Sequence, residues 1–145
     1  MQFRSGPGQF YSRGVLVEHV LSQPLTISIV DDDDCVREAL VGLMQSHGFH
    51  AESFESSIGF LGSETLHRTD CLIADMHMPG MTGLALFDAL GSAGRRIPTI
   101  LITARHNVET RERALLSGVY CYLPKPFAEA ELLHCVRSAT GTRID

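Results

Sequence analysis

The sequence predicts a doubly wound α/β fold, in which helices cover both faces of a parallel sheet. Short apolar runs alternate five times with segments whose apolar residues recur at helical spacing. The run at 71–74 lacks polar alternation, which is typical of a strand that is buried on both faces. A chain of 145 residues with 44% hydrophobic content is the size of one domain with a single core.

The first unit begins with a buried type of strand at 25–30. A helix follows, with Val36, Leu40, Leu43 and Met44 on one face and Arg37, Glu38 and Gln45 on the other. Asp33 or Asp34 is expected to cap its N-terminus. His47-Gly48 ends the helix as a left-handed glycine stop would.

Four further units complete the alternation and give five strands and five helices. The predicted elements are a strand at 49–54, a short helix at 56–62, a strand at 71–74, a helix capped by Thr82, a strand at 98–103, a helix at about 107–117, a strand at 120–123 and a helix at about 128–139. The position before the last helix holds Ala128, and the missing polar cap is expected to cost about 1 kcal/mol of local stability.

The two ends of the chain lack this pattern. Residues 1–24 mix turn formers with scattered aromatic residues and are expected to be an extension, partly disordered. The domain itself is expected at 25–139, and 140–145 is expected to be a tail or the start of a linker. The apolar segment 15–21 is too short for a membrane span and is a poor signal peptide.

Charge and cysteine content indicate which kinds of ligand and cross-link to expect. The net charge is −5, with four acids in a row from Asp31 to Asp34, so a nucleic-acid surface is not expected and a cation site is. The four cysteines form no Cys-x-x-Cys pair, so neither a zinc site nor a disulfide framework is indicated. Reduced core thiols in the cytoplasm are the plainest interpretation.

Polar residues gather where the predicted strands end. Asp31 and Asp32 follow the first strand, Asp75 the third and Lys125 the fifth, while Thr103 ends the fourth. Ligands of such sheets bind outside the carboxyl ends of the strands, so these residues are expected to share one edge. Unpaired carboxylates would repel one another there unless a cation were bound, and oxygen ligands favour Mg²⁺. The chain has eleven arginines and this one lysine, so the position favours a compact, movable ammonium.

Four motifs in order resemble the receiver domain of bacterial two-component response regulators, and the residues of the later motifs are most similar to those of FixJ-type receivers. They are Ile29-Val30-Asp31-Asp32-Asp33, Asp75-Met76-His77-Met78-Pro79-Gly80-Met81-Thr82-Gly83, Leu101-Ile102-Thr103-Ala104 and Lys125-Pro126-Phe127, within a match from about Leu25 to Arg137. The resemblance implies a flavodoxin-like sheet with strand order 2-1-3-4-5. It also implies a signalling phosphoacceptor in a phosphorelay, with only self-phosphorylation and self-dephosphorylation chemistry.

The resemblance also assigns roles to single residues. Asp75 would be the phosphoacceptor, and Mg²⁺ would be held by Asp32, Asp75 and the backbone carbonyl of His77, with Asp31 acting through water. Thr103, the backbone N–H of Ala104 and the Lys125 ammonium would bind the phosphoryl group, Tyr122 would be a switch residue, and Lys125-Pro126 would be a cis peptide. Arg105 is further expected to shield the phosphoryl group from water.

The implied partners are a sensor histidine kinase or phosphotransfer protein, without nucleic acid or membrane. The fourth helix, fifth strand and fifth helix would form the output face and a possible homodimer contact, with Val108, Arg111, Tyr122 and Glu129 as candidates. The chain would be either a complete single-domain receiver or the receiver of a transcription regulator. The alternatives are a haloacid-dehalogenase-like phosphatase, which needs a second Asp where His77 stands, and a flavodoxin-like electron carrier, which needs a Ser/Thr-rich loop where the four aspartates stand.

Overall fold

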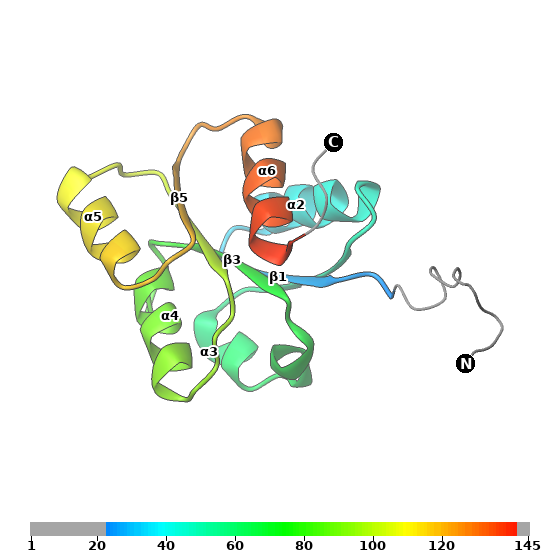
Figure 1. The fold of residues 1–145 in the computed structure, drawn as a ribbon, viewed down its shortest axis with the longest axis horizontal. Coiled ribbons are helices and arrows are strands. Elements are labelled where there is room, and N and C mark those ends of the chain that lie inside the picture. The colour runs from blue at the N-terminus through cyan, green and yellow to red at the C-terminus, as the bar shows by residue number, and fades with distance from the viewer. Residues whose placement is uncertain (1–22, 142–145) are drawn as a thin grey trace, which may run out of the picture.

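The computed structural model describes residues 23–141, which fold as a parallel sheet between two layers of helices (Figure 1). In chain order the elements are β1 (Thr26–Val30), α2 (Asp34–Ser46), β2 (His50–Phe54), α3 (Ser57–Leu61), η1 (Glu64–Arg68), β3 (Cys71–Asp75), α4 (Gly83–Ser92), β4 (Thr99–Thr103), α5 (Val108–Leu116), β5 (Cys121–Pro124) and α6 (Glu129–Thr140). Most bounds agree with the predicted ones within two residues. The predicted extension at 1–24 lies almost wholly outside the described residues.

The sheet has the strand order β2-β1-β3-β4-β5, and every neighbouring pair is parallel. This confirms the predicted doubly wound topology. The register places Val30 beside Ala74, and Asp75 beside Ile102. The carboxyl ends of β1, β3 and β4 therefore lie next to one another at one edge of the sheet.

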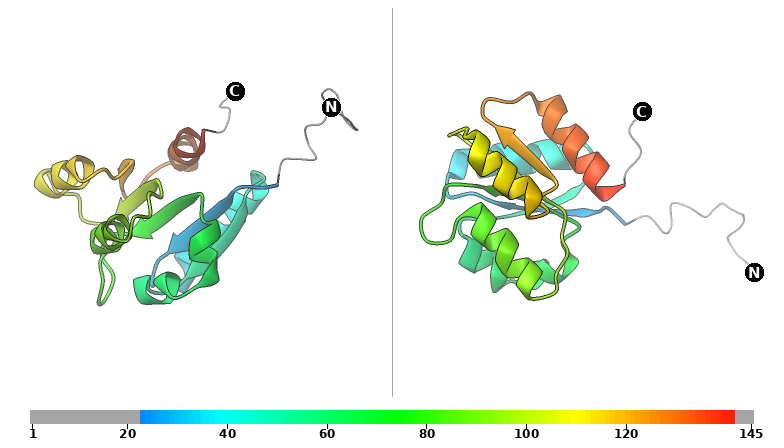
Figure 2. Two further views of the ribbon diagram at one scale, coloured as in Figure 1. Left: turned by 60° about the horizontal axis from the view of Figure 1, so that its bottom comes forward. Right: turned by 60° about the vertical axis from the view of Figure 1, so that its left-hand side comes forward.

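Alternate side chains of each strand enter two separate hydrophobic cores. Ile27 and Ile29 pack with buried residues of α2 and α6, whereas Val30 and Leu72 pack with those of α3 and α4. Figure 1 shows α2 and α6 on one side of the sheet and α3 and α4 on the other, and Figure 2 shows the layers from two further directions. All five residues of β1, β3 and β4 are buried, as expected for strands covered on both faces.

The predicted helix caps are largely confirmed. Asp33, not Asp34, is the N-cap of α2, since its carboxylate accepts from the N–H groups of Cys35 and Val36 at 2.8 and 3.2 Å. Gly48 has the predicted left-handed conformation, with φ +88°. Ala128 offers no side-chain cap to α6, but the Glu131 carboxylate accepts its N–H at 2.9 Å and supplies half of a capping box.

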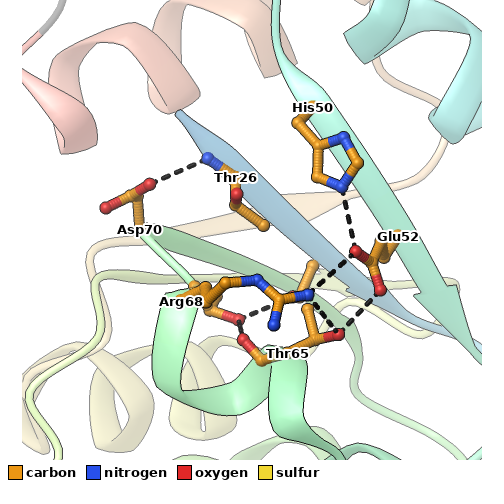
Figure 3. A network of polar contacts seen from close by, with 8 residues as sticks. Thr26, His50, Glu52, Thr65, Arg68 and Asp70 are labelled. Carbon is orange, nitrogen blue, oxygen red and sulfur yellow. Dashed lines mark hydrogen bonds and ion pairs between the residues drawn. The ribbon is translucent and has the colours of Figure 1, made fainter. Parts of the chain in front are cut away.

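The 3₁₀ helix η1 was not predicted, because a single short turn has no apolar periodicity to reveal it. Side chains attach it to the edge of the sheet, as Figure 3 shows. The Thr65 hydroxyl donates to the Glu52 carboxylate at 2.7 Å, and that carboxylate also contacts His50 at 2.9 Å and Arg68 at 3.4 Å. The Thr65 bond and the His50 bond lower the pKa of Glu52.

The cysteines are all free, but one of them departs from the expected core position. Cys71 and Cys135 are buried and Cys121 is partly buried, whereas Cys35 is exposed in the first turn of α2. Burial raises the pKa of the Cys71 thiol to about 12. Between residues 23 and 141, every helix is too short or too polar to cross a bilayer.

Candidate functional site

Three carboxylates converge at the carboxyl ends of β1 and β3. Ligand oxygens of Asp31, Asp32 and Asp75 all lie within 4.8 Å of one another. Asp31 and Asp75 are only 3% and 8% exposed, while Asp32 faces solvent. The sequence predicted this cluster, and the parallel register of adjacent strands brings it together.

The electrostatics of the cluster favour a bound cation. Burial raises the pKa of Asp31, and the charges of Asp32 and Asp33 add to the effect. Burial also raises the pKa of Asp75, as does the neighbouring charge of Asp31. The Lys125 ammonium acts in the opposite direction on both carboxyl groups but does not cancel the shifts.

Lys125 follows β5 directly, as predicted, and its backbone is fixed to the neighbouring strand. Its N–H donates to the carbonyl of Thr103 at 2.7 Å, and the Lys125–Pro126 peptide bond is cis, as the resemblance implied. The side chain is partly buried and lies close enough to Asp31 and Asp75 to influence both. The site therefore joins three acidic groups to one ammonium.

Thr103 is fully buried at the end of β4, and its hydroxyl has three close contacts. It lies 3.0 Å from both the backbone nitrogen and the carbonyl oxygen of Arg105. The third contact is the Nε2 atom of His77 at 3.1 Å. The sequence favoured a backbone role for His77 as a metal ligand, and the contact of its imidazole with Thr103 was not predicted. Ala104 is exposed immediately after Thr103.

Tyr122 lies inside the domain and not on its surface. Its ring is 7% exposed, packs in the core of the α3 and α4 side, and lies 6.3 Å from the His106 ring between centroids. The expectation that Tyr122 offers contact area to a partner is therefore wrong. Its buried hydroxyl has no hydrogen-bond partner among residues 23–141.

Two residues that support the site were not assigned a role from the sequence. Arg37 was placed on the outer face of its helix, yet its side chain turns back, donates to the Asp31 carbonyl at 2.5 Å and pairs with Asp34. Gly83 begins α4 where an added Cβ would lie 2.6 Å from the Asp75 carbonyl oxygen. For Arg37, the spacing of three residues from Asp34 was a signal in the sequence that its side chain could turn back along the helix. For Gly83, no local sequence pattern indicated the close approach to Asp75.

The residues present suit a hard divalent cation. Carboxylate oxygens are the ligands that Mg²⁺ takes in proteins, and two buried carboxyl groups with raised pKa values gain most from a neighbouring positive charge. Asp31 is also held in place, because its Oδ1 atom accepts the N–H of Asp33 at 2.9 Å. The arrangement can bind a cation among three carboxylates, with an ammonium and a hydroxyl nearby.

Comparisons with known proteins agree with this geometry. The family model described as the response regulator receiver domain matches residues 27–137. Response regulator protein TmoT of Ectopseudomonas mendocina is 35% identical over 139 residues, covering 96% of this chain and 61% of the relative. Transcriptional regulatory protein FixJ of Azorhizobium caulinodans is 31% identical over 121 residues, covering 83% of this chain and 57% of the relative.

A solved structure shows the same likeness in three dimensions. The crystal structure of FixJ-N superposes with a TM-score of 0.74 and 28% identity, covering 86% of this chain and 99% of that one. The chain spans less than two thirds of the length of the two curated relatives. Family match, sequence likeness and fold agree with the motifs at the strand ends, and the chain belongs to the response regulator receiver domain family.

Proposed function

We propose that this domain accepts a phosphoryl group on Asp75 from the phosphohistidine of a sensor kinase or phosphotransfer protein. The observation that carries the proposal is the cluster of Asp31, Asp32 and Asp75, whose ligand oxygens lie within 4.8 Å of one another. The Asp75 carboxylate oxygen would attack phosphorus as the bond from phosphorus to the histidine nitrogen breaks. The leaving imidazole keeps the electron pair, and the product is an acyl phosphate on Asp75.

The residues around Asp75 supply charge and orientation for this transfer. Phosphoryl transfer has a loose transition state with charge on the equatorial oxygens, so positive groups lower its energy. The Lys125 ammonium already lowers the pKa of Asp75 and is free to follow the phosphoryl group on its flexible stem. The Thr103 hydroxyl and the Ala104 N–H would bind phosphoryl oxygens.

Asp32, Asp75 and the His77 carbonyl would hold Mg²⁺, with Asp31 acting through a water molecule. The ion would offset the negative charge of the incoming phosphoryl group and of the carboxylates. Asp31 contributes a buried charge whose orientation the Asp33 N–H maintains. Arg37 holds the Asp31 carbonyl and so keeps the loop after β1 in place.

We further propose that phosphorylation is read on the face formed by α5, β5 and α6. Val108 at the start of α5 is 59% exposed, and Arg111 and Glu129 are exposed as well. Tyr122 lies beneath this face, so the position of its ring would change the packing of α5 without direct contact with a partner. The outputs would be a homodimer through this face or transcription control by a longer protein.

Phosphorylation by a small phosphodonor tests the proposal. The purified chain is incubated with phosphoramidate, with and without Mg²⁺, and intact mass is measured. One added phosphoryl group is expected only with Mg²⁺, and it is expected to disappear in Asp75→Asn. Phosphorylation that persists in Asp75→Asn, or that ignores chelation of Mg²⁺, would contradict the proposed site.

A further inference from the structure

The His77 imidazole connects the segment that follows Asp75 to Thr103 at the end of β4. His77 lies two residues after Asp75, in the segment between β3 and α4, and its Nε2 atom is 3.1 Å from the Thr103 hydroxyl oxygen. β3 and β4 are adjacent and parallel, with Asp75 beside Ile102 in the register. The imidazole therefore bridges two strand ends at the edge where the phosphoryl group would be attached.

The hydroxyl of Thr103 is already fully engaged without that group. It accepts the N–H of Arg105 and lies at hydrogen-bond distance from the Arg105 carbonyl and from His77 Nε2. A hydroxyl has one proton to donate. Phosphoryl oxygens only accept hydrogen bonds, so binding one requires Thr103 to give up the single hydrogen bond that it now donates, to the Arg105 carbonyl or to His77 Nε2.

We propose that His77 is a latch on Thr103, which holds the hydroxyl in the unphosphorylated arrangement and releases it when a phosphoryl oxygen on Asp75 takes its place. The inference rests on the proposed function. The other two contacts come from the backbone of Arg105, so His77 is the side chain through which the position of Thr103 is tuned. His77 is thus a positioning residue, because it acts through Thr103.

Beryllofluoride, a mimic of the aspartyl phosphate, measures the latch directly. His77→Phe keeps a ring of similar size but removes the hydrogen bond, whereas His77→Gln places an amide near the Nε2 position. With saturating Mg²⁺, His77→Phe is expected to bind beryllofluoride about three- to tenfold more tightly, the value of one lost hydrogen bond. His77→Gln is expected to stay close to wild type.

A second readout reports Thr103 itself. In protein without beryllofluoride, the methyl NMR signal of Thr103 is expected to move towards its beryllofluoride-bound position in His77→Phe but not in His77→Gln. His67→Phe is the matched control, because it changes an exposed histidine on η1 and is expected to match wild type in both measurements.

The outcomes separate the latch from the proposed function. If wild type binds beryllofluoride through Asp75 and His77→Phe binds it no more tightly, the latch is wrong and the proposed function stands. Equal behaviour of His77→Phe and His77→Gln would also overturn the latch, since the hydrogen bond would then not be the cause. If wild type does not bind beryllofluoride, or if Asp75→Asn binds it as well as wild type does, both the latch and the proposed function are wrong.

Discussion

Two acidic regions of this domain carry opposite electrostatic character. At the β2 edge, Glu52 accepts hydrogen bonds from Thr65 and His50 and pairs with Arg68, and the pKa of Glu52 is lowered. At the carboxyl ends of β1 and β3, Asp31 and Asp75 are buried beside each other, and the pKa of each is raised. The charge of Glu52 is stabilised by its neighbours, whereas burial disfavours the charges of Asp31 and Asp75 even though Asp31 accepts the N–H of Asp33.

The difference separates an acid that stabilises the fold from the two acids of the proposed site. Glu52 stabilises the fold above its unfolded pKa, near 4.5, and this contribution is lost as pH falls through its lowered folded pKa. Asp31 and Asp75 behave oppositely, because the folded protein holds their protons more tightly than the unfolded chain does. Their contribution becomes unfavourable as pH rises from 3.8 through the raised folded pKa values. A cation or a phosphoryl group with its metal would relieve this unfavourable charge.

Mg²⁺ is expected to stabilise the protein through the cluster of Asp31, Asp32 and Asp75 and not through the Glu52 region, and this is the largest effect that we predict. At about 100 times the dissociation constant, mass action stabilises the folded protein by about 2.7 kcal/mol. The Tm would rise by about 5–10 °C for a domain of this size, measured by thermal denaturation after metal removal. Glu52→Gln should show the same rise and Asp75→Asn little of it. A rise that survives in Asp75→Asn would place the cation elsewhere.

Gly83→Ala tests how closely the fold packs against the acidic cluster. The added Cβ would lie 2.6 Å from the Asp75 carbonyl oxygen and 2.9 Å from Leu101 Cδ2. Overpacking of this kind is expected to cost about 2 kcal/mol, measured by urea denaturation. Gly91→Ala in the same helix is the control, since its Cβ meets nothing within 4 Å and should cost no stability.

Lys125→Arg tests whether the site needs an ammonium or only a positive charge. The guanidinium is planar and directional, so it should follow the phosphoryl group poorly. We expect the rate of phosphorylation by phosphoramidate to fall about tenfold, or about 1.4 kcal/mol in activation free energy. Arg68→Lys beside Glu52 is the control, because it exchanges the same two residue types away from the site, and it should leave the rate of phosphorylation unaltered. A wild-type rate in Lys125→Arg would show that charge alone suffices.

Thr65→Val tests whether Glu52 stabilises the fold. The substitution removes the 2.7 Å hydrogen bond to Glu52 and should destabilise the domain by about 1 kcal/mol at neutral pH. The gap between variant and wild type should narrow as the pH falls below 4.5, because Glu52 then becomes protonated in both. Urea denaturation at a series of pH values measures it. A gap that widens in acid would contradict the assigned direction.

Arg105→Ala is expected to give the smallest effect. Arg105 is exposed two residues after Thr103, where its side chain is expected to shield the phosphoryl group from water. Its removal should speed loss of the phosphoryl group a few-fold, followed by intact mass after the phosphodonor is removed. Arg113→Ala on α5 serves as the control. An unchanged rate in Arg105→Ala would end the shielding hypothesis.

Much of the fold and the core of the site followed from the sequence alone. Strand and helix periodicity, glycine stops and the Asp33 and Thr82 caps are local patterns, so they predicted the elements closely. The edge bearing Asp31, Asp75 and Lys125 was also predictable, because parallel strands place their carboxyl ends together. The 3₁₀ helix η1 was not, since one turn carries too little local information.

Only the tertiary structure decided the contacts between segments that are far apart in the sequence and the contacts of side chains that turn back towards their own segment. The burial of Tyr122, the return of Arg37 to the Asp31 carbonyl and the close packing of Gly83 against Asp75 depend on how layers meet. The His77 contact with Thr103 depends on two strand ends 26 residues apart in the chain. Sequence patterns report which face a residue occupies, whereas the partner across the interface is set by packing of the whole domain.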